Sequence, residues 1–281
     1  MLCFDEQAAL GSIPKLSRAL SWDVSCAMLD LGETLAAPFD KRNRFPGRTS
    51  LPEAIVDHSL SVLAMTIADI CRNDARSMAA LAPPVSQLAL SYSGAQGADS
   101  PVPTCIKPDM SFPLRGIYLG DSNERVVPLM AEFKTMCVDN VGDVTSSCKG
   151  EQALFDAGIL QAVRYMARLL LAKLDCLPAT QKLPRLETWC AIVSNGRTLC
   201  FARAVLTHDA FVVYVTPPAP LLNRPPIGAF ARFLSEKRLE QCFTCTAGVL
   251  LWARVLAARP EHLLGAKVVK LLPPPLRTAW F

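Results

Sequence analysis

The feature that most restricts the fold of this chain is a pair of apolar segments, 188–193 and 198–204, separated by Ser194-Asn195-Gly196-Arg197. An Asn-Gly pair accepts the left-handed backbone of a tight turn, and it is the strongest short-range signal for a β-hairpin. The sequence therefore predicts two antiparallel strands here. Residues 210–215 predict one more strand.

A third apolar run, 126–135, begins Val-Val-Pro-Leu-Met-Ala and ends in Glu-Phe-Lys-Thr. This pattern predicts a buried strand whose far end reaches a polar site. Pro128 has no N–H to donate to a neighbouring strand, so we expect an edge or bulged position there. Shorter alternating segments, 109–114 and 115–119, precede this run and are followed by a turn at 120–123.

Two long stretches show helical periodicity. In the first, Ser50 resembles an N-cap with Glu53 three residues on, and apolar residues recur on one face to about Ala82. The second runs from Glu151 to about Leu174. Polar or small residues predict loops at 36–50, 91–103 and 139–150, and residues from 227 onward read as helices.

The order of these segments predicts a mixed α/β or α+β protein, in which a strand cluster follows the first helices and precedes the last ones. We expect three regions: an N-terminal helical and loop extension at 1–50, a core at 51–216, and a C-terminal helical extension packed on the core at 217–281. With 281 residues, 51% of them apolar, the chain can bury a sizeable core, which excludes an intrinsically disordered protein.

No segment predicts a membrane span or an export signal. The most apolar windows, 159–174 and 247–256, are interrupted or flanked by arginine or lysine, and neither offers the ~18 uncharged residues that a span needs. The cysteines number eleven, an odd count that favours reduced thiols over a disulfide framework. We expect an intracellular protein, nuclear or cytoplasmic, without membrane partners.

Charge is distributed unevenly along the chain. Residues 1–150 hold 13 Lys and Arg against 17 Asp and Glu, a net −4, whereas residues 151–281 hold 16 against 8, a net +8. A basic second half can follow a phosphate backbone, and arginine binds phosphate through two parallel hydrogen bonds. On charge alone, solvated helix faces are the simpler explanation.

Three residues form the most informative constellation: Asp109 after Pro108, and Glu132 and Lys134 at the end of the 126–135 run. Residues two apart on a strand project to the same face, and the spacing to Asp109 allows an adjacent strand. Two carboxylates provide the hard oxygen ligands that Mg²⁺ or Mn²⁺ prefers, and a bound metal activates water and polarises a phosphodiester. The lysine can position that water or stabilise the developing charge.

The motifs Pro108-Asp109 and Glu132-Phe133-Lys134 resemble those of the PD-(D/E)XK superfamily of restriction-endonuclease-like nucleases. The nearest resemblance is to the nuclease-like domains of fungal mobile-element, RHS-like and Crinkler-type proteins, and it covers roughly 50–215. The resemblance implies a mixed sheet flanked by helices, and a metal-dependent endonuclease in which Asp109 and Glu132 bind Mg²⁺ (or Mn²⁺).

The same resemblance implies supporting residues on two helices. The helix after the Glu-x-Lys strand often carries a glutamine with an aromatic residue one turn later, which Gln161 and Tyr165 match. An acid on the first helix often reaches the metal, and Glu53 and Asp57 are both candidates. His58 is a further candidate ligand, although a surface histidine is the simpler interpretation. The residues expected to contact nucleic acid are Arg164, Tyr165, Arg168 and Arg197.

Other enzyme classes lack support, because neither a Gly-x-x-x-x-Gly-Lys phosphate loop nor a Gly-x-Ser-x-Gly nucleophile motif occurs. The leading hypothesis is a nuclease that hydrolyses phosphodiester bonds of DNA, with RNA the less favoured substrate. The alternative is a catalytically inactive nuclease-fold module that binds nucleic acid or a protein. A third reading is an interaction domain whose apolar C-terminal helices form a homodimer or partner surface.

Overall fold

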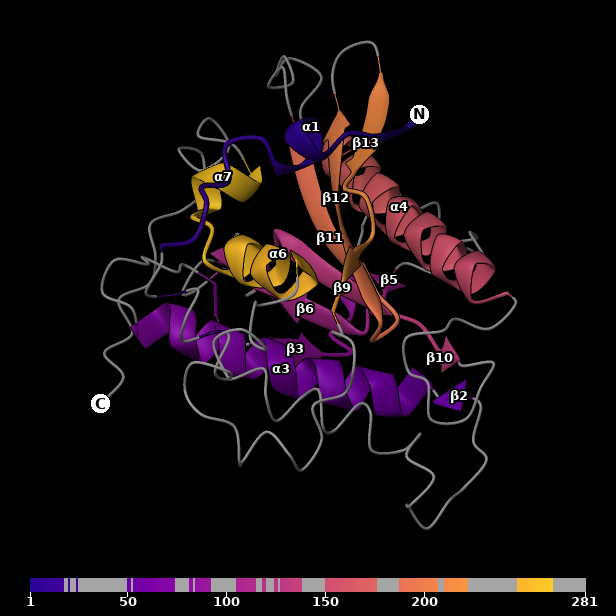
Figure 1. Ribbon diagram of the computed structural model, residues 1–281. Helices are drawn as coiled ribbons and strands as arrows, with labels where there is room; N and C mark the ends of the chain where they lie inside the picture. The colour runs from indigo at the N-terminus through magenta and orange to yellow at the C-terminus, as the bar shows by residue number, and fades with distance from the viewer. Residues whose placement is uncertain are drawn as a thin grey trace, which may run out of the picture.

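A computed structural model gives the fold as a mixed α/β architecture built on one eight-stranded sheet (Figure 1). The structure describes residues 1–17, 20, 24, 50, 51, 53–73, 81, 82, 84–91, 105–114, 118, 119, 124, 125, 127–137, 150–175, 187–206, 210–221 and 247–264. None of the helices formed by these residues is both long enough and apolar enough to cross a membrane.

The sheet has the strand order β1-β13-β12-β11-β9-β6-β3, with β14 paired to β12. The β9–β11 and β1–β13 pairs are parallel and the other pairs are antiparallel. The strands are β1 (Leu2–Phe4), β3 (Val85–Ser86), β6 (Met110–Phe112), β9 (Leu129–Phe133), β11 (Glu187–Ser194), β12 (Thr198–Leu206), β13 (Phe211–Val215) and β14 (Ala219–Pro220).

Three two-stranded pairs lie outside the main sheet. They are β2 (Ser50–Leu51) with β10 (Met136–Cys137), β4 (Leu90–Ser91) with β5 (Cys105–Ile106), and β7 (Tyr118–Leu119) with β8 (Glu124–Arg125).

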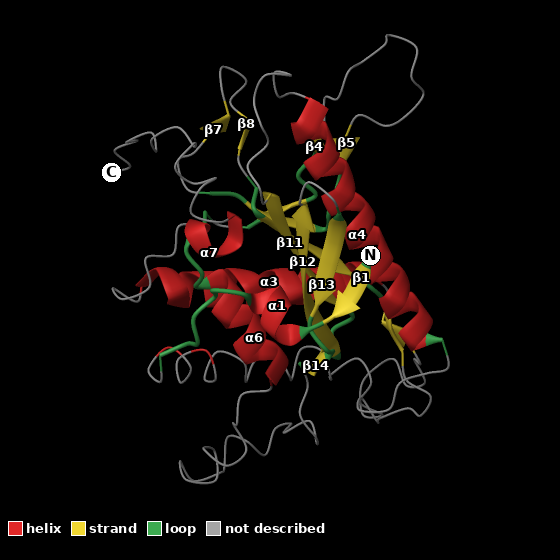
Figure 2. Cartoon of the chain, turned by 90° about the horizontal axis from the view of Figure 1, so that it is seen from above, coloured by secondary structure: helices red, strands yellow, loops and turns green. Residues whose placement is uncertain are grey.

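Helices cover both faces of the sheet. Figure 2 shows α4 on one side, and α1, α3, α6 and α7 on the other. The helix bounds are α1 (Glu6–Leu10), α3 (Glu53–Asn73), α4 (Glu151–Asp175), α6 (Ala247–Leu256) and α7 (Pro260–Leu264). Because the sheet is covered twice, the inner strand β9 is buried along its whole length, as the sequence predicts for an apolar run.

Two hydrophobic clusters, one on each face, hold the layers together. On the α4 face, Phe155, Ile159 and Met166 recur at the helical spacing of four and seven residues and pack against Ala191 and Val193. On the other face, residues of α3 and α6 pack against Leu129, Ala131 and Phe133 of β9, among other strand residues. Successive β9 side chains therefore alternate between the two clusters.

The predicted hairpin is confirmed. β11 and β12 pair antiparallel with Ser194 opposite Leu199, and Gly196 adopts the left-handed backbone that its lack of Cβ permits (φ +82°). The Asn195 side chain closes the turn by accepting hydrogen bonds from the N–H groups of Arg197 and Thr198. The helix predicted from Glu151 and the strand predicted at 210–215 are confirmed as α4 and β13.

Three local predictions are wrong. Ser50 is not an N-cap but lies in β2. The first helix, described as far as Asn73, does not continue to Ala82, since Leu81 forms a β-bridge with Leu114. Pro128 does not mark an edge strand, because β9 lies between β6 and β11. The proline directly precedes β9, where only its carbonyl is needed and accepts the N–H of Cys190.

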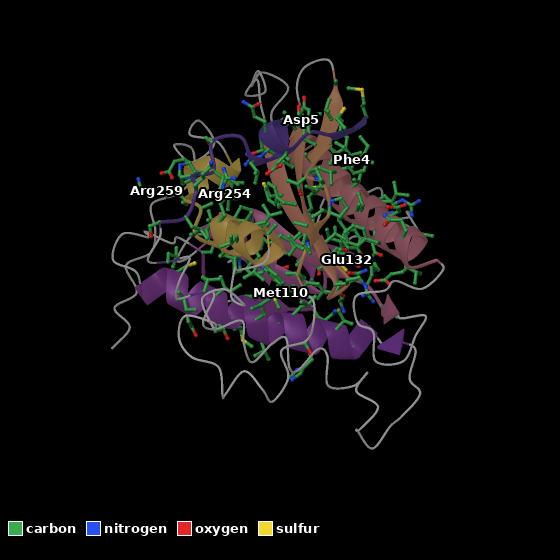
Figure 3. The ribbon with its side chains drawn as sticks, in the orientation of Figure 1. Phe4, Asp5, Met110, Glu132, Arg254 and Arg259 are labelled. Carbon is green, nitrogen blue, oxygen red and sulfur yellow. The ribbon has the colours of Figure 1, made fainter. Side chains whose placement is uncertain are left out.

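The first residues of the chain join the main body of the fold. Residues 2–4, assigned by sequence to an extension, form the outer strand β1, and Arg254 of α6, labelled in Figure 3, donates to the carbonyls of Ile13 and Pro14. Arg203 of β12 similarly donates to the Ala9 carbonyl at 2.6 Å. Of the loops predicted at 36–50, 91–103 and 139–150, only Ser50, Ser91 and Gly150 are described, and the first two lie in β2 and β4. The turn predicted at 120–123 and the segments 222–246 and 265–281 lie outside the described residues.

Candidate active site

The register of β6 against β9 brings Asp109 beside Glu132. Met110 pairs with Ala131 in this antiparallel ladder, so the next position along places Asp109, which immediately precedes β6, across from Glu132. Residues opposite each other in a ladder project to the same face of the sheet. Ala131 and Phe133 belong to the cluster on the α3 face and Met130 to the cluster on the α4 face, so Glu132 projects toward α4.

Asp109 is held by hydrogen bonds from two neighbouring strands. Its Oδ2 accepts the backbone N–H of Phe133 at 2.6 Å, and its Oδ1 accepts the side-chain amide of Gln87 at 3.2 Å. The first bond extends the β6–β9 ladder, with a carboxylate in the place of a backbone carbonyl. The half-buried Asp109 side chain is therefore fixed against the end of β9.

Glu132 and Lys134 form an ion pair in the interior. The Lys134 Nζ lies 2.8 Å from Glu132 Oε1, and the two side chains are only 12% and 3% exposed. A charge removed from water needs a partner of opposite sign, which the lysine provides. The expected same-face placement of these two residues is thus borne out by their direct contact.

Gly158 of α4 makes room for Lys134. A Cβ at position 158 would lie 2.8 Å from the Lys134 Cγ and 3.1 Å from the Val193 Cγ1. Glycine costs helix stability at an interior position, about 1 kcal/mol relative to alanine, so its presence here reflects the close approach of the lysine. The helix and the catalytic candidate are consequently in direct contact.

Gln161 and Tyr165 lie further along α4, on the same side of the helix as Gly158. Gln161 donates its amide to the Tyr165 hydroxyl at 2.9 Å, and both side chains are half-buried. The spacings of three and four residues place Gly158, Gln161 and Tyr165 on one side of the helix. This side adjoins the face of β9 that carries Glu132 and Lys134.

The two acids expected to reach the metal from the first helix, Glu53 and Asp57, belong to α3. Pairing of Leu51 with Met136 ties the start of α3 to the chain just beyond Lys134, although α3 covers the opposite face of the sheet. Asp57 is half-buried and accepts the Ser61 hydroxyl at 3.2 Å, one turn away on its own helix. His58 is exposed. Glu53 is the first residue of α3, and its side chain is outside the described part of the structure.

Of the arginines expected to contact nucleic acid, Arg164 and Arg168 are exposed on α4, whereas Arg197 is buried. Arg197 Nε donates to Glu151 Oε1 at 3.0 Å, and the Asn195 side chain donates to the same oxygen at 2.6 Å. This network joins the start of α4 to the β11–β12 turn.

Sequence reasoning missed Glu151, Gly158 and Gln87. Glu151 marks only a helix start in the sequence, Gly158 lies in the middle of a helical pattern, and Gln87 lies in a short polar segment before a loop. None of them belongs to a recognisable motif. Their contacts depend on elements 20 or more residues away, so sequence spacing gave no signal.

As a metal site, the described residues supply two carboxylates at one sheet end. Within the described ranges, no group of three or more His, Cys, Asp and Glu side chains is placed to hold a metal ion. Two carboxylates fit Mg²⁺, which retains several waters and takes further oxygen ligands from substrate phosphates. The donor set thus fits a hard divalent cation that is completed by water and substrate.

Comparison of the sequence with models of known protein families and with curated proteins gave no match.

Proposed function

We propose that this protein is a metal-dependent nuclease that hydrolyses phosphodiester bonds, with DNA the favoured substrate and RNA the less favoured one. The observation that carries the proposal is the placement of Asp109 across from Glu132, with Lys134 paired to Glu132 at 2.8 Å. The order α3, β3, β6, β9, α4, β11, in which β9 and β11 are parallel, supports the proposed restriction-endonuclease-like core.

In this proposal Asp109 and Glu132 would hold Mg²⁺ or Mn²⁺, which when bound polarises the phosphodiester and lowers the pKa of a bound water. The two carboxylates reach the site from neighbouring strands, so the backbone ladder fixes their separation. Gln161 would support the site from α4. Of the two acids of α3, Glu53 would supply a further oxygen ligand, because Asp57 forms no metal-holding group with Asp109 and Glu132 in the described residues.

Lys134 has two roles in this scheme. It balances the charge of Glu132 while the pair is buried, and it would orient the attacking water or stabilise charge on the phosphate once a metal takes over that balance. Its aliphatic chain rests on Gly158, which limits where the ammonium can move. Arg164 and Arg168 would contact phosphates on the exposed side of α4, with Tyr165 beside them.

One observation favours a non-cutting module as the second candidate. The Lys134 ammonium already pairs with Glu132, and both oxygens of Asp109 accept hydrogen bonds from the protein. These contacts can stabilise the fold even when no metal is bound. The fold would then serve to bind nucleic acid or a protein, since fold does not determine activity. A homodimer through the C-terminal helices remains a prediction, and most side chains of α6 are buried against the sheet.

The test is cleavage of labelled single- and double-stranded DNA and RNA with Mg²⁺ or Mn²⁺, compared with chelator alone. Asp109→Asn and Glu132→Gln should each reduce cleavage by about a thousandfold or more, because metal ligands contribute several kcal/mol to transition-state stabilisation. Asp156→Asn is the matched control, since it removes an exposed acid of α4 whose hydrogen bond within the described residues is a local one, accepted from Gln152. Wild-type protein that cuts none of these substrates would exclude the nuclease and leave the binding module.

A further inference from the structure

Gln87 lies directly after β3 in an unusual backbone conformation. Its φ of +51° is in the left-handed region, and no other non-glycine residue in the described part of the chain has a positive φ. A residue with a Cβ adopts this conformation at a cost, and such residues persist where surrounding contacts compensate. The contacts that compensate here all lead to one residue, Asp109.

Three hydrogen bonds connect the end of β3 to Asp109. The Gln87 N–H and the Ser86 hydroxyl donate to the Asp109 carbonyl at 3.0 and 3.2 Å. The Gln87 side-chain amide donates to the Asp109 carboxylate, at Oδ1. In its left-handed conformation, Gln87 thus contacts the same aspartate with both its main chain and its side chain.

The other carboxylate oxygen of Asp109 is held from the opposite side by the Phe133 N–H at 2.6 Å. The donors from Gln87, just after β3, and from Phe133 of β9 together restrict rotation of the carboxylate about its Cβ–Cγ bond. A carboxylate oxygen can accept more than one bond, so these contacts orient the group without preventing coordination of a cation. Partners of this kind raise the affinity of a metal ligand by fixing its orientation.

We propose that Gln87 is a positioning residue that holds the Asp109 carboxylate in the orientation required to bind the divalent cation. The inference rests on the proposed nuclease function, because that function makes Asp109 a metal ligand. It adds the residue that directly follows β3, an edge strand that carries none of the motif residues. The residue acts through Asp109 and need not touch the substrate.

The test compares Gln87→Gly with Ser86→Ala by titrating Mn²⁺ into each full-length protein in a calorimeter. Gln87→Gly removes the carboxamide and relieves the backbone strain, so its melting temperature should be unchanged or higher. Its Kd for Mn²⁺ should nevertheless rise about tenfold or more. Ser86→Ala loses a bond to the Asp109 backbone only, and its Kd should stay within about twofold of wild type. Gln87→Met, which keeps the length but lacks a donor, should behave like Gln87→Gly.

A second readout is independent of the metal. Hydrogen exchange of the Phe133 amide, measured by NMR without metal, should be faster in Gln87→Gly because its carboxylate acceptor is held less firmly. Wild-type affinity for Mn²⁺ in Gln87→Gly, or unchanged Phe133 exchange, would overturn the positioning role and leave the nuclease proposal intact. Wild-type protein that binds no Mn²⁺ would overturn both.

Discussion

The backbone of Gly158 in α4 lies against the side chain of Lys134, so closely that a Cβ on the glycine would be 2.8 Å from the lysine Cγ. A helix interior normally favours alanine over glycine by about 1 kcal/mol. The chain gives up this stability at the one turn of α4 that meets the lysine. The position of the ammonium group is thus controlled from a helix that itself contributes no part of the Glu-x-Lys motif.

Gly158→Ala should therefore impair cleavage, and its effect on the cleavage rate should exceed what its loss of folding stability explains. The added methyl must displace the Lys134 side chain, whose position sets that of the ammonium, and we expect cleavage to fall by about tenfold or more, since misplaced catalytic groups are costly. Introducing the same change into a Lys134→Ala background should be better tolerated in thermal unfolding, because the closest contact is gone. Equal destabilisation in both backgrounds would indicate that Val193, at 3.1 Å, is the group that clashes.

Lys134→Ala should destabilise the folded protein as well as abolish cleavage. Removing one partner of a buried ion pair leaves the Glu132 carboxylate without its contact at 2.8 Å, a change that costs about 3 kcal/mol. Urea unfolding in the presence of a chelator measures this cost. Glu132→Gln/Lys134→Met, which removes both charges, should recover much of the loss, and a double variant as unstable as Lys134→Ala would contradict the argument.

Substitution of Arg197 should affect protein stability, whereas substitution of Arg164 and Arg168 should affect nucleic-acid binding. Arg197→Ala breaks a buried contact with Glu151 and should cost about 3 kcal/mol in unfolding free energy. Arg164→Ala/Arg168→Ala removes exposed charges and should change stability by less than about 0.5 kcal/mol. If both arginines bind phosphates, the slope of log affinity against log salt for duplex DNA should become shallower by roughly two. An unchanged slope would place them on an ordinary solvated face.

Cys190 and Cys200 should resist alkylation in the folded protein. Burial raises the pKa of both thiols, that of Cys200 to about 12, and the thiolate is the reactive form. Iodoacetamide at pH 8 followed by mass spectrometry should leave both unmodified, whereas the half-buried Cys3 and Cys105 should be labelled. In urea all four should react, which provides the internal control. Rapid labelling of Cys200 without denaturant would show that β12 opens readily.

The same raised pKa values predict a loss of stability at alkaline pH. A thiol that ionises near 9 when unfolded but near 12 in the fold keeps its proton longer in the folded state. Its contribution to stability is therefore present below pH 9 and is lost as pH rises from about 9 toward 12. Cys200→Ala should show a smaller decrease in unfolding free energy between pH 8.5 and 10.5 than wild type. Parallel pH profiles for the two proteins would contradict this account.

Local patterns in the sequence determined the elements that depend on neighbouring residues. The Asn195-Gly196 turn specified its hairpin because few other residues accept that backbone, and the periodicity from Glu151 specified α4 because one apolar face recurs every three to four residues. The same-face relation of Glu132 and Lys134 also follows from strand geometry alone. These are short-range constraints, and the tertiary structure left them unchanged.

Only the tertiary structure decided which of these elements meet. Pro128 suggested an edge strand, but β9 became an inner strand because β11 pairs with it from 61 residues away. Arg197 looked like a surface charge until the start of α4 placed Glu151 against it. Gln87 follows β3, Asp109 precedes β6 and Phe133 ends β9. The choice of strand partners depends on how two apolar faces are buried together. That burial is a property of the whole chain, which no local segment encodes.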